Sequence, residues 1–221
     1  MTRFADRADA GRQLAHALGG YRGSDVIVLG LPRGGVPVAY QVAAALDAPL
    51  DVLVVRKLGV PYQPELAFGA IGEGGVKVLN DGVLRRTTLN VADIASVEAQ
   101  QRAELQRRIE VYRGGRPGLD LSGRMVLIID DGFATGATAR AAALVARARG
   151  AGTVVLAAPI GAVDTIAGLR EVADEVVCLG VPRDFVAVGQ GYDDFRQTSD
   201  AQVCELLAAA HRDRPGPETG Q

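Results

Sequence analysis

Val126–Thr138, with the sequence VLIIDDGFATGAT, is the stretch that decides the fold of this chain. Its first four residues form a short apolar run bounded by polar and glycine signals, which predicts a strand buried on both faces of a parallel sheet. The acidic pair Asp130 and Asp131 follows at the carboxyl end of that strand. The loop Gly132–Thr138 then leads into Ala139–Arg149, an alanine-rich segment with high helix propensity. We therefore expect a strand, an acidic pair, a loop of small residues and a helix.

The loop has the composition of an anion cradle. Glycine lets the backbone approach a ligand closely, and the free N–H groups at a helix start hold an anion with the help of the helix dipole. Thr135 and Thr138 add hydroxyl donors. Because carboxylates repel phosphate, Asp130 and Asp131 should face ribose hydroxyls or a ligand-borne Mg²⁺ instead. The residues predict a ribose 5-phosphate ligand.

Three other interpretations of the stretch explain less of it. A P-loop needs a lysine before its Ser or Thr, and Gly136-Ala137-Thr138 has none. A receiver domain also has an acidic pair after a strand, but near its amino terminus and without a threonine-glycine loop. An ordinary strand-to-helix turn would explain Gly136 but not two aspartates beside two threonines.

The stretch resembles the signature of type I phosphoribosyltransferases, which is an apolar strand, two acidic residues, two variable residues, and a small residue followed by Thr-Gly-x-Thr. The resemblance implies that Asp130 and Asp131 are the catalytic pair, which contacts the ribose hydroxyls of phosphoribosyl pyrophosphate and the Mg²⁺ bound to it. It further implies a 5′-phosphate loop made of Gly132, Phe133, Ala134, Thr135, Gly136, Ala137 and Thr138.

An earlier strand, loop and helix repeats this arrangement. Val26–Gly30 predicts a buried strand, LPRGG follows it, and a helix is expected from about Val36 to Leu46. In the resembled family the loop after the first core strand binds pyrophosphate, often beside a cis non-proline peptide. The resemblance therefore places a cis bond between Pro32 and Arg33. It places Arg33, Gly34 and Gly35 around the leaving group.

A third strand is predicted over Leu50–Val55, with Arg56 and Lys57 at its carboxyl end. Ligands of open parallel sheets bind at that edge, so these cations are placed to hold pyrophosphate. The alternative is a solvated strand end.

The segment from about residue 58 to 90 is rich in glycine, with short strands predicted over Ala67–Ile71 and Val76–Leu79. The resembled family carries a mobile loop or hairpin here that closes over the ligand. Glu65 and Glu73 lie in it, and the sequence assigns neither a role.

The rest of the chain alternates helices and strands, which predicts an α/β fold with a doubly wound parallel sheet, a Rossmann-like three-layer architecture of the phosphoribosyltransferase type. Asn90 with Asp93 predicts a helix start, and Ala92–Tyr112 has helical composition, with the pairs Glu98–Arg102 and Glu104–Arg108 four residues apart. The arginines there are interleaved with glutamates, which indicates a solvated helix face more than a nucleic-acid patch. The other expected elements are a first helix ending at Gly19-Gly20, strands Thr153–Ala157 and Glu175–Leu179, a helix Val163–Val172 between them, and a last helix Asp200–Ala210 capped by Ser199.

Residues 180–198 break this alternation with aromatics set among glycines and aspartates. They resemble the small hood subdomain of purine phosphoribosyltransferases, in which an aromatic equivalent to Phe185 stacks on the base. Phe185 could equally pack in the hood's own core. Two departures leave the acceptor open: Ala134 stands where hypoxanthine-guanine enzymes have an aspartate, and the lysine that reads their purine has no counterpart before Val181.

Length and composition limit the number of domains and the classes of partner that we expect. With 221 residues, 48% of them apolar, the chain can bury one substantial core, so we expect a single domain over 1–211 and a disordered tail over 212–221. A net charge of −2 gives no general attraction to nucleic acid or membrane. No leader is evident at Met1–Gly20, which predicts a cytoplasmic protein. Cys178 and Cys204 are expected to be free thiols.

The arrangement LPRGG, VVRKLG, DDGFATGAT and VGQGYDDF, from about Gly23 to Phe195, most resembles bacterial proteins named only for a phosphoribosyltransferase domain. The resemblance implies an enzyme that uses Mg²⁺ and phosphoribosyl pyrophosphate, or a nucleoside monophosphate in reverse, to transfer ribose 5-phosphate to or from a nitrogenous base or related amine. A regulatory protein that binds these ligands without turnover is the alternative. The family also suggests a homodimer.

Overall fold

The central layer is a five-stranded parallel sheet. The computed structural model describes residues 3–213, except the side chains of Glu65 and Asp213. The strands lie in the order β2 (Leu50–Val52), β1 (Val26–Gly30), β6 (Met125–Ile129), β7 (Thr153–Ile160) and β8 (Glu175–Gly180). From β1 the chain adds β2 on one side, and β6, β7 and β8 extend the sheet on the other. The strand order therefore reverses between β1 and β6.

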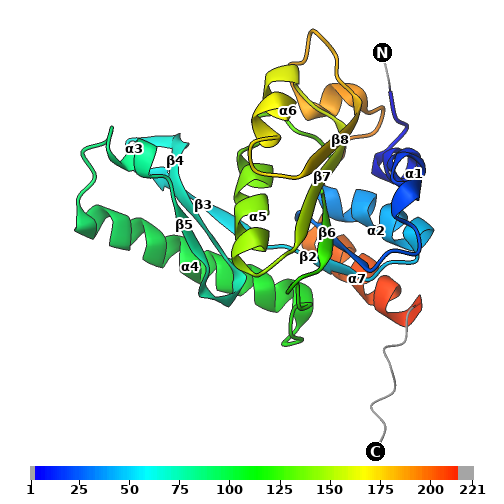
Figure 1. Cartoon of the computed structure of the whole chain (residues 1–221), viewed down its shortest axis with the longest axis horizontal. Helices are drawn as coiled ribbons and strands as arrows, with labels where there is room; N and C mark the ends of the chain where they lie inside the picture. Colours follow the sequence, from blue (N-terminus) through cyan, green and yellow to red (C-terminus); the bar gives the residue numbers. More distant parts are fainter. Residues whose placement is uncertain (1–2, 214–221) are drawn as a thin grey trace, which may run out of the picture.

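Helices cover both faces of this sheet (Figure 1). Alternate residues of β1 point to opposite sides, so Val26 and Val28 join one buried cluster while Ile27 and Leu29 join the other. The first cluster packs under α1 (Arg7–Ala17), α2 (Gly35–Leu46) and α7 (Asp200–Asp213). The second packs under α5 (Ala137–Ala148) and α6 (Val163–Leu169). This is the predicted doubly wound, three-layer fold.

An arm, residues 55–113, projects from the sheet (Figure 1). It is made of the antiparallel strands β3 (Val55–Val60), β4 (Gln63–Gly72) and β5 (Lys77–Leu79), the turn η2 (Glu73–Gly75), the short helix α3 (Asp81–Leu84) and the long helix α4 (Val91–Arg113). The strand predicted over Ala67–Ile71 falls within β4, and the one predicted over Val76–Leu79 begins one residue before β5. The predicted hairpin is therefore present, with a third strand that the sequence did not separate.

The strand predicted over Leu50–Val55 is too long. Parallel pairing with β1 ends at Val52, and from Val55 the backbone pairs with Gly72 of β4 instead. The run LDVLVV is apolar across this change of partner, so hydrophobicity alone carries no sign of it. Arg56 and Lys57 consequently lie inside β3 of the arm and not at the end of a strand in the central sheet.

The long helix α4 begins as its capping pattern predicts. The Asn90 side chain accepts a hydrogen bond from the Asp93 N–H (2.9 Å), and the Asp93 carboxylate accepts one from the Asn90 N–H (3.1 Å). The expected pairs four residues apart are present between Glu98 and Arg102 (2.6 Å) and between Glu104 and Arg108. The helix ends at Gly114, whose φ of 56° suits glycine.

The hood is tied to the start of the chain. It contains the single turn η3 (Val188–Gly191), and the Phe4 N–H donates to the Gly191 carbonyl (2.8 Å). Phe4 and Tyr192 form a small buried cluster with Ala10 and Ile160. No local pattern in the sequence indicates this pairing between residues nearly 190 positions apart.

The last helix starts where predicted and runs further. The Ser199 hydroxyl accepts a hydrogen bond from the Gln202 N–H (3.1 Å) at its start. α7 reaches Asp213, so residues 212 and 213 are helical although the tail was expected to begin at 212. Residues 214–221 of the predicted tail lie outside the described residues. A second single turn, η1 (Gly19–Tyr21), follows α1. No helix within residues 3–213 is long and apolar enough to cross a membrane.

Candidate functional site

The two glycine-bearing loops meet at the reversal of strand order. β1 and β6 pair in parallel with Gly30 opposite Ile129, so the loops 31–35 and 130–138 leave the same edge of the sheet side by side. The Leu31 N–H donates to the Ile129 carbonyl (2.9 Å) and joins the two loop starts. In open α/β sheets this crevice is where ligands bind.

Glycine is required where the first loop touches the second. A Cβ on Gly35 would lie 2.5 Å from the Ile129 carbonyl oxygen. A Cβ on Gly34 would lie 1.9 Å from the Asp131 carboxylate. The peptide bond between Pro32 and Arg33 is cis, as the resemblance implies. The loop predicted for the leaving group therefore packs directly on the acidic pair.

The acidic pair is largely buried. The backbone N–H of Asp131 donates to the Asp130 carboxylate (2.9 Å) and fixes the Asp130 side chain against the backbone. Burial, and next the charge of Asp131, raise the pKa of Asp130 well above its ordinary value. Burial also raises the pKa of Asp131, against the opposing charge of Arg7. The two carboxylates thus crowd negative charge into a space with little water, which favours a cationic partner.

Arg7, which no sequence motif singled out, is the cation that meets Asp131. Its Nε lies 2.8 Å from Asp131 Oδ2, and both side chains are mostly buried. Its Nη1 donates to the Arg196 carbonyl (2.7 Å), and its guanidinium lies over the Phe195 ring, 4.0 Å from the centroid. The Tyr192 hydroxyl donates to the Asp131 carbonyl oxygen (2.6 Å). Sequence reasoning missed Arg7 because its partners lie more than 120 residues away.

The predicted phosphate loop has an open side and a buried side. Ala134, Thr135 and Thr138 are exposed, and Gly136, with φ at 68°, is the residue at which α5 starts. Phe133 differs: its side chain is only 1% exposed and packs in the core, while its N–H and carbonyl bond to Ile160 and Ala162. The geometry therefore makes Phe133 a scaffold residue of the loop and gives no support to its predicted ligand contact.

A cavity of about 550 Å³ lies between the loops and the arm. It brings together Pro32 of the first loop, Thr138 of the second, and Arg56 and Lys57 of β3. Although their strand was wrongly predicted, the two cations thus lie beside the sheet edge as expected. Arg33, Gly34 and Gly35 lie outside its lining. The arm's long helix adds a wall that the sequence pattern presented as a solvated face: Val97, Gln100, Gln101 and Arg108.

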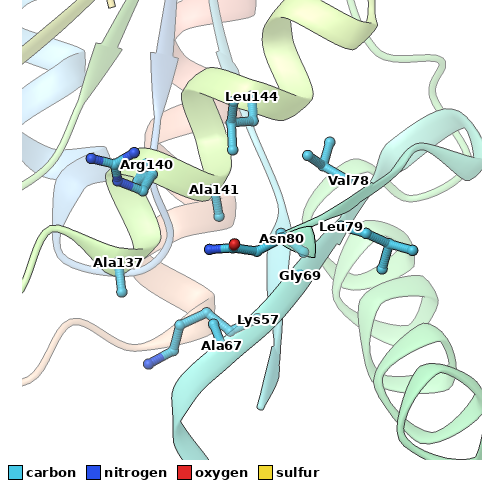
Figure 2. Close-up of a pocket in the computed structure, with 11 residues that line it drawn as sticks. Lys57, Ala67, Gly69, Val78, Leu79, Asn80, Ala137, Arg140, Ala141 and Leu144 are labelled. Atoms are coloured by element: carbon cyan, nitrogen blue, oxygen red, sulfur yellow. The ribbon is translucent and has the colours of Figure 1, made fainter. Parts of the chain in front are cut away.

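A second cavity, of about 80 Å³, adjoins the first through Lys57. Figure 2 shows the small side chains Ala137 and Ala141 of α5 across from Lys57 and Asn80 of the arm. The close approach of the arm to the start of α5 leaves little room on this side of the predicted phosphate loop. The larger of these two cavities is therefore the candidate ligand site.

Comparisons with known proteins identify the family. The family model described as "Phosphoribosyl transferase domain" matches residues 5–195. The chain belongs to this family. Two Mycobacterium tuberculosis proteins, from strains H37Rv and CDC 1551, bear the name of a phosphoribosyl transferase and are 62% identical over 213 residues, 96% of this chain and 48% of theirs. The chain thus spans about half the length of these relatives.

Solved structures of similar proteins agree on the fold. The TT1426 protein from Thermus thermophilus is 44% identical, with a TM-score of 0.86 over 94% of this chain and 98% of that one. The AQ2163 protein from Aquifex aeolicus is 12% identical, with a TM-score of 0.50 over 92% and 85% of the two chains. The second likeness shows the fold alone.

Phe185, which the family resemblance singled out, and Glu73, to which the sequence assigned no role, both have structural contacts. Phe185 is half-buried and packs against the hood cluster around Phe4 and Tyr192. Glu73 is buried, accepts a hydrogen bond from the Val54 N–H (3.1 Å) and pairs with Arg113. The structure thus gives Glu73 a role in holding the arm. Glu65 keeps no assignment, because its side chain is not described.

The acidic pair fits a ligand-borne magnesium ion better than a magnesium cage built by the protein. Within residues 3–213 no group of three or more His, Cys, Asp or Glu side chains is placed to hold a metal. Mg²⁺ is commonly bound by one or two carboxylates together with substrate phosphates. Asp130 and Asp131 supply two mostly buried carboxylates for that arrangement, and a metal ion at Asp131 would have to share that carboxylate with Arg7.

Proposed function

We propose that this domain binds Mg²⁺-phosphoribosyl pyrophosphate and transfers ribose 5-phosphate to or from a nitrogenous base or related amine. One observation carries the proposal: the acidic pair and the glycine loops lie where the strand order of the sheet reverses, and the cavity with Arg56 and Lys57 reaches these loops at Pro32 and Thr138. The metal, the substrate and the acceptor all belong to the proposal, as does the activity of any longer protein of which this domain forms part.

Each element would hold one part of the substrate. The N–H groups of Thr135–Thr138 at the start of α5, with two threonine hydroxyls, would bind the 5′-phosphate. Asp130 and Asp131 would accept hydrogen bonds from the ribose hydroxyls. Arg56 and Lys57 would hold the pyrophosphate in the cavity. The first two groups lie on the loop after β6 and the third on β3 of the arm, so the ribose would be held between the sheet edge and the arm.

The chemistry needs little from the protein beyond position and charge. Loss of pyrophosphate from the ribose carbon passes through an oxocarbenium-like state, and the buried carboxylates provide negative charge close to the developing cation. Bound Mg²⁺ would neutralise the leaving pyrophosphate, with Asp130 or Asp131 as its protein ligand. Ala134 offers no proton acceptor, so the acceptor base must lose its proton to another group.

The regulatory alternative is favoured by the contact between Arg7 and Asp131. Asp131 already holds a guanidinium at 2.8 Å, and a ribose hydroxyl must share or replace that partner. A protein that only senses phosphoribosyl pyrophosphate could use this exchange to move the hood. Turnover distinguishes the two functions.

The test is pyrophosphate release from labelled phosphoribosyl pyrophosphate with Mg²⁺ and a pool of bases and amines. We expect base-dependent release, and we expect Asp131→Asn to lower kcat/KM by about 100-fold, as for the loss of one preorganised electrostatic group. Asp193→Asn is the control, because Asp193 is an exposed hood carboxylate paired with Arg3. Ligand binding without release across the pool would favour the sensor, and absence of binding would refute the site.

A further inference from the structure

We propose that Arg108 of α4 is a further substrate-binding residue, which contacts the outer phosphate of the pyrophosphate, and that Gln101 is the positioning residue that aims Arg56 at the same group. The proposal rests on the proposed ligand, because it extends the pyrophosphate side of that site onto the arm. It assigns a ligand-binding function to a helix that the sequence presents as a solvated surface.

One face of α4 forms the outer wall of the cavity. Val97, Gln101 and Arg108 are four and seven residues apart, so they fall on the same side of the helix. The cavity is also lined by Pro32 and Thr138, which belong to the two loops at the sheet edge. A ligand whose 5′-phosphate sits on the second loop would therefore extend its pyrophosphate toward this helical face.

Cations converge on the cavity. The Arg56 Nε donates to Gln101 Oε1 (2.8 Å), which holds the guanidinium of β3 beside α4. The pKa of Arg56 is lowered, first by burial and next by the charge of Arg108. No carboxylate is among the described residues that line the cavity. An anion bound in the cavity between the guanidinium groups of Arg56 and Arg108 would relieve the repulsion between them.

Glu104 is the nearby carboxylate on α4, and it leaves most of Arg108 available. The Arg108 Nε donates to Glu104 Oε1 (2.7 Å). The structure gives its two terminal nitrogens no hydrogen bond to another described residue. Arg107 instead donates both Nε and Nη2 to Glu104 (2.8 and 3.0 Å). Glu104 thus orients Arg108 by one nitrogen and leaves the paired donors that suit phosphate.

Arg107 is a matched control for Arg108. The two residues are adjacent, carry the same charge and share Glu104. The Arg107 side chain is 56% exposed and lies outside the cavity lining, whereas that of Arg108 is 32% exposed and lines the cavity. Arg107→Met and Arg108→Met change the net charge equally, so a difference between them reports direct contact with the ligand.

The experiment measures binding of three probes by calorimetry in the presence of Mg²⁺: phosphoribosyl pyrophosphate, inorganic pyrophosphate and ribose 5-phosphate. We expect Arg108→Met to weaken binding of both pyrophosphate-containing probes by about tenfold or more, the scale of one lost charge-assisted hydrogen bond. Ribose 5-phosphate should bind as in the wild type. Arg107→Met should change none of the three affinities, and Arg108→Lys should restore part of the loss. Gln101→Leu should weaken the same two probes.

Four outcomes would overturn the inference. Equal weakening by Arg107→Met and Arg108→Met would mean that both arginines act on the ligand only through long-range electrostatics. No weakening by Arg108→Met would mean that Arg108 does not contact the ligand. Weakened ribose 5-phosphate binding in Arg108→Met would mean a disturbed fold. A wild-type protein that does not bind pyrophosphate refutes the inference directly. Arg108-dependent pyrophosphate binding without any turnover would support it while refuting the proposed transferase.

Discussion

Burial is the main influence on the charge of the acidic pair, and the guanidinium of Arg7 opposes it. Arg7 is the cation in contact with Asp131, whereas Asp130 is buried beside the like charge of Asp131, with the Asp131 N–H and the more distant Arg7 charge opposing these effects. Both carboxylates have raised pKa values even so. A carboxylate whose pKa is raised on folding destabilises the folded state above its unfolded pKa, and that cost falls as the pH falls through the folded pKa.

We therefore expect Arg7→Met to cost stability in a pH-dependent way. Breaking a mostly buried pair costs about 3 kcal/mol at pH 8, because the charge left on Asp131 has lost its partner. At pH 5 the carboxylate of the variant takes up a proton more readily, so the loss should be smaller. Urea unfolding of wild type and variant at the two pH values measures this. An equal loss at both would mean that Arg7 acts only through packing on Phe195.

At the scale of elements, the sequence predicted those helices, strands and loops whose positions depend on a local pattern of residues. The apolar runs of β1, β6 and β7, the capping residues Asn90 and Asp93, and the glycine loops all lie where the pattern indicates. The end of β2 was wrong, because Val55 changes its pairing partner without any change in hydrophobicity.

The acidic pair and the cations of β3 were found because each belongs to a local motif. Arg7, Gln101 and Arg108 belong to no local motif, and only the folded chain brings them close to the proposed ligand site. The pairing of Phe4 with Tyr192 was not predicted from the sequence for the same reason. Contacts between distant segments follow from the three-dimensional arrangement. A single sequence contains no periodic residue pattern from which such contacts can be predicted.

The crossing of β4 over α5 gives a prediction for two elements together. A Cβ on Gly72 would lie 2.3 Å from the Val145 Cγ1. Gly72→Ala should therefore destabilise the fold by about 1–3 kcal/mol through overpacking. Val145→Ala should cost less in the Gly72→Ala background than alone, because it removes the clashing methyl groups.

Chemical denaturation of the four proteins in this cycle measures the coupling. Gly20→Ala is the control, because a Cβ there meets no atom within 4 Å. Strict additivity of the two substitutions would show that the strand and the helix move apart freely at this crossing.

For the whole molecule, a buried ionic cluster joins the arm to the body. Arg113, at the end of α4, donates Nε to Asp51 of β2 (3.0 Å) and Nη2 to the Val52 carbonyl (2.8 Å), and it pairs with Glu73. Arg149, after α5, lies 3.5 Å from the same Glu73 carboxylate. The arm carries Arg56, Lys57 and Arg108, so this cluster sets where the cavity's cations stand relative to the sheet edge.

Arg113→Met should weaken both stability and ligand binding, although Arg113 lies outside the lining of the cavity. Removing it leaves Asp51 and Glu73 buried with less compensation, which costs about 3–5 kcal/mol. Arg102→Met is the control, because its exposed pair with Glu98 on the same helix contributes about 0.5 kcal/mol or less.

Urea unfolding and calorimetry with inorganic pyrophosphate and Mg²⁺ measure the two effects, under conditions in which the variant stays folded. If the arm is held in place by the cluster, pyrophosphate affinity falls along with stability, because the cations lose their fixed distance from the glycine loops. A variant that is less stable but binds pyrophosphate as the wild type does would mean that the strand pairing of β3 and the packing of the arm on α5 position the cations without the ionic cluster.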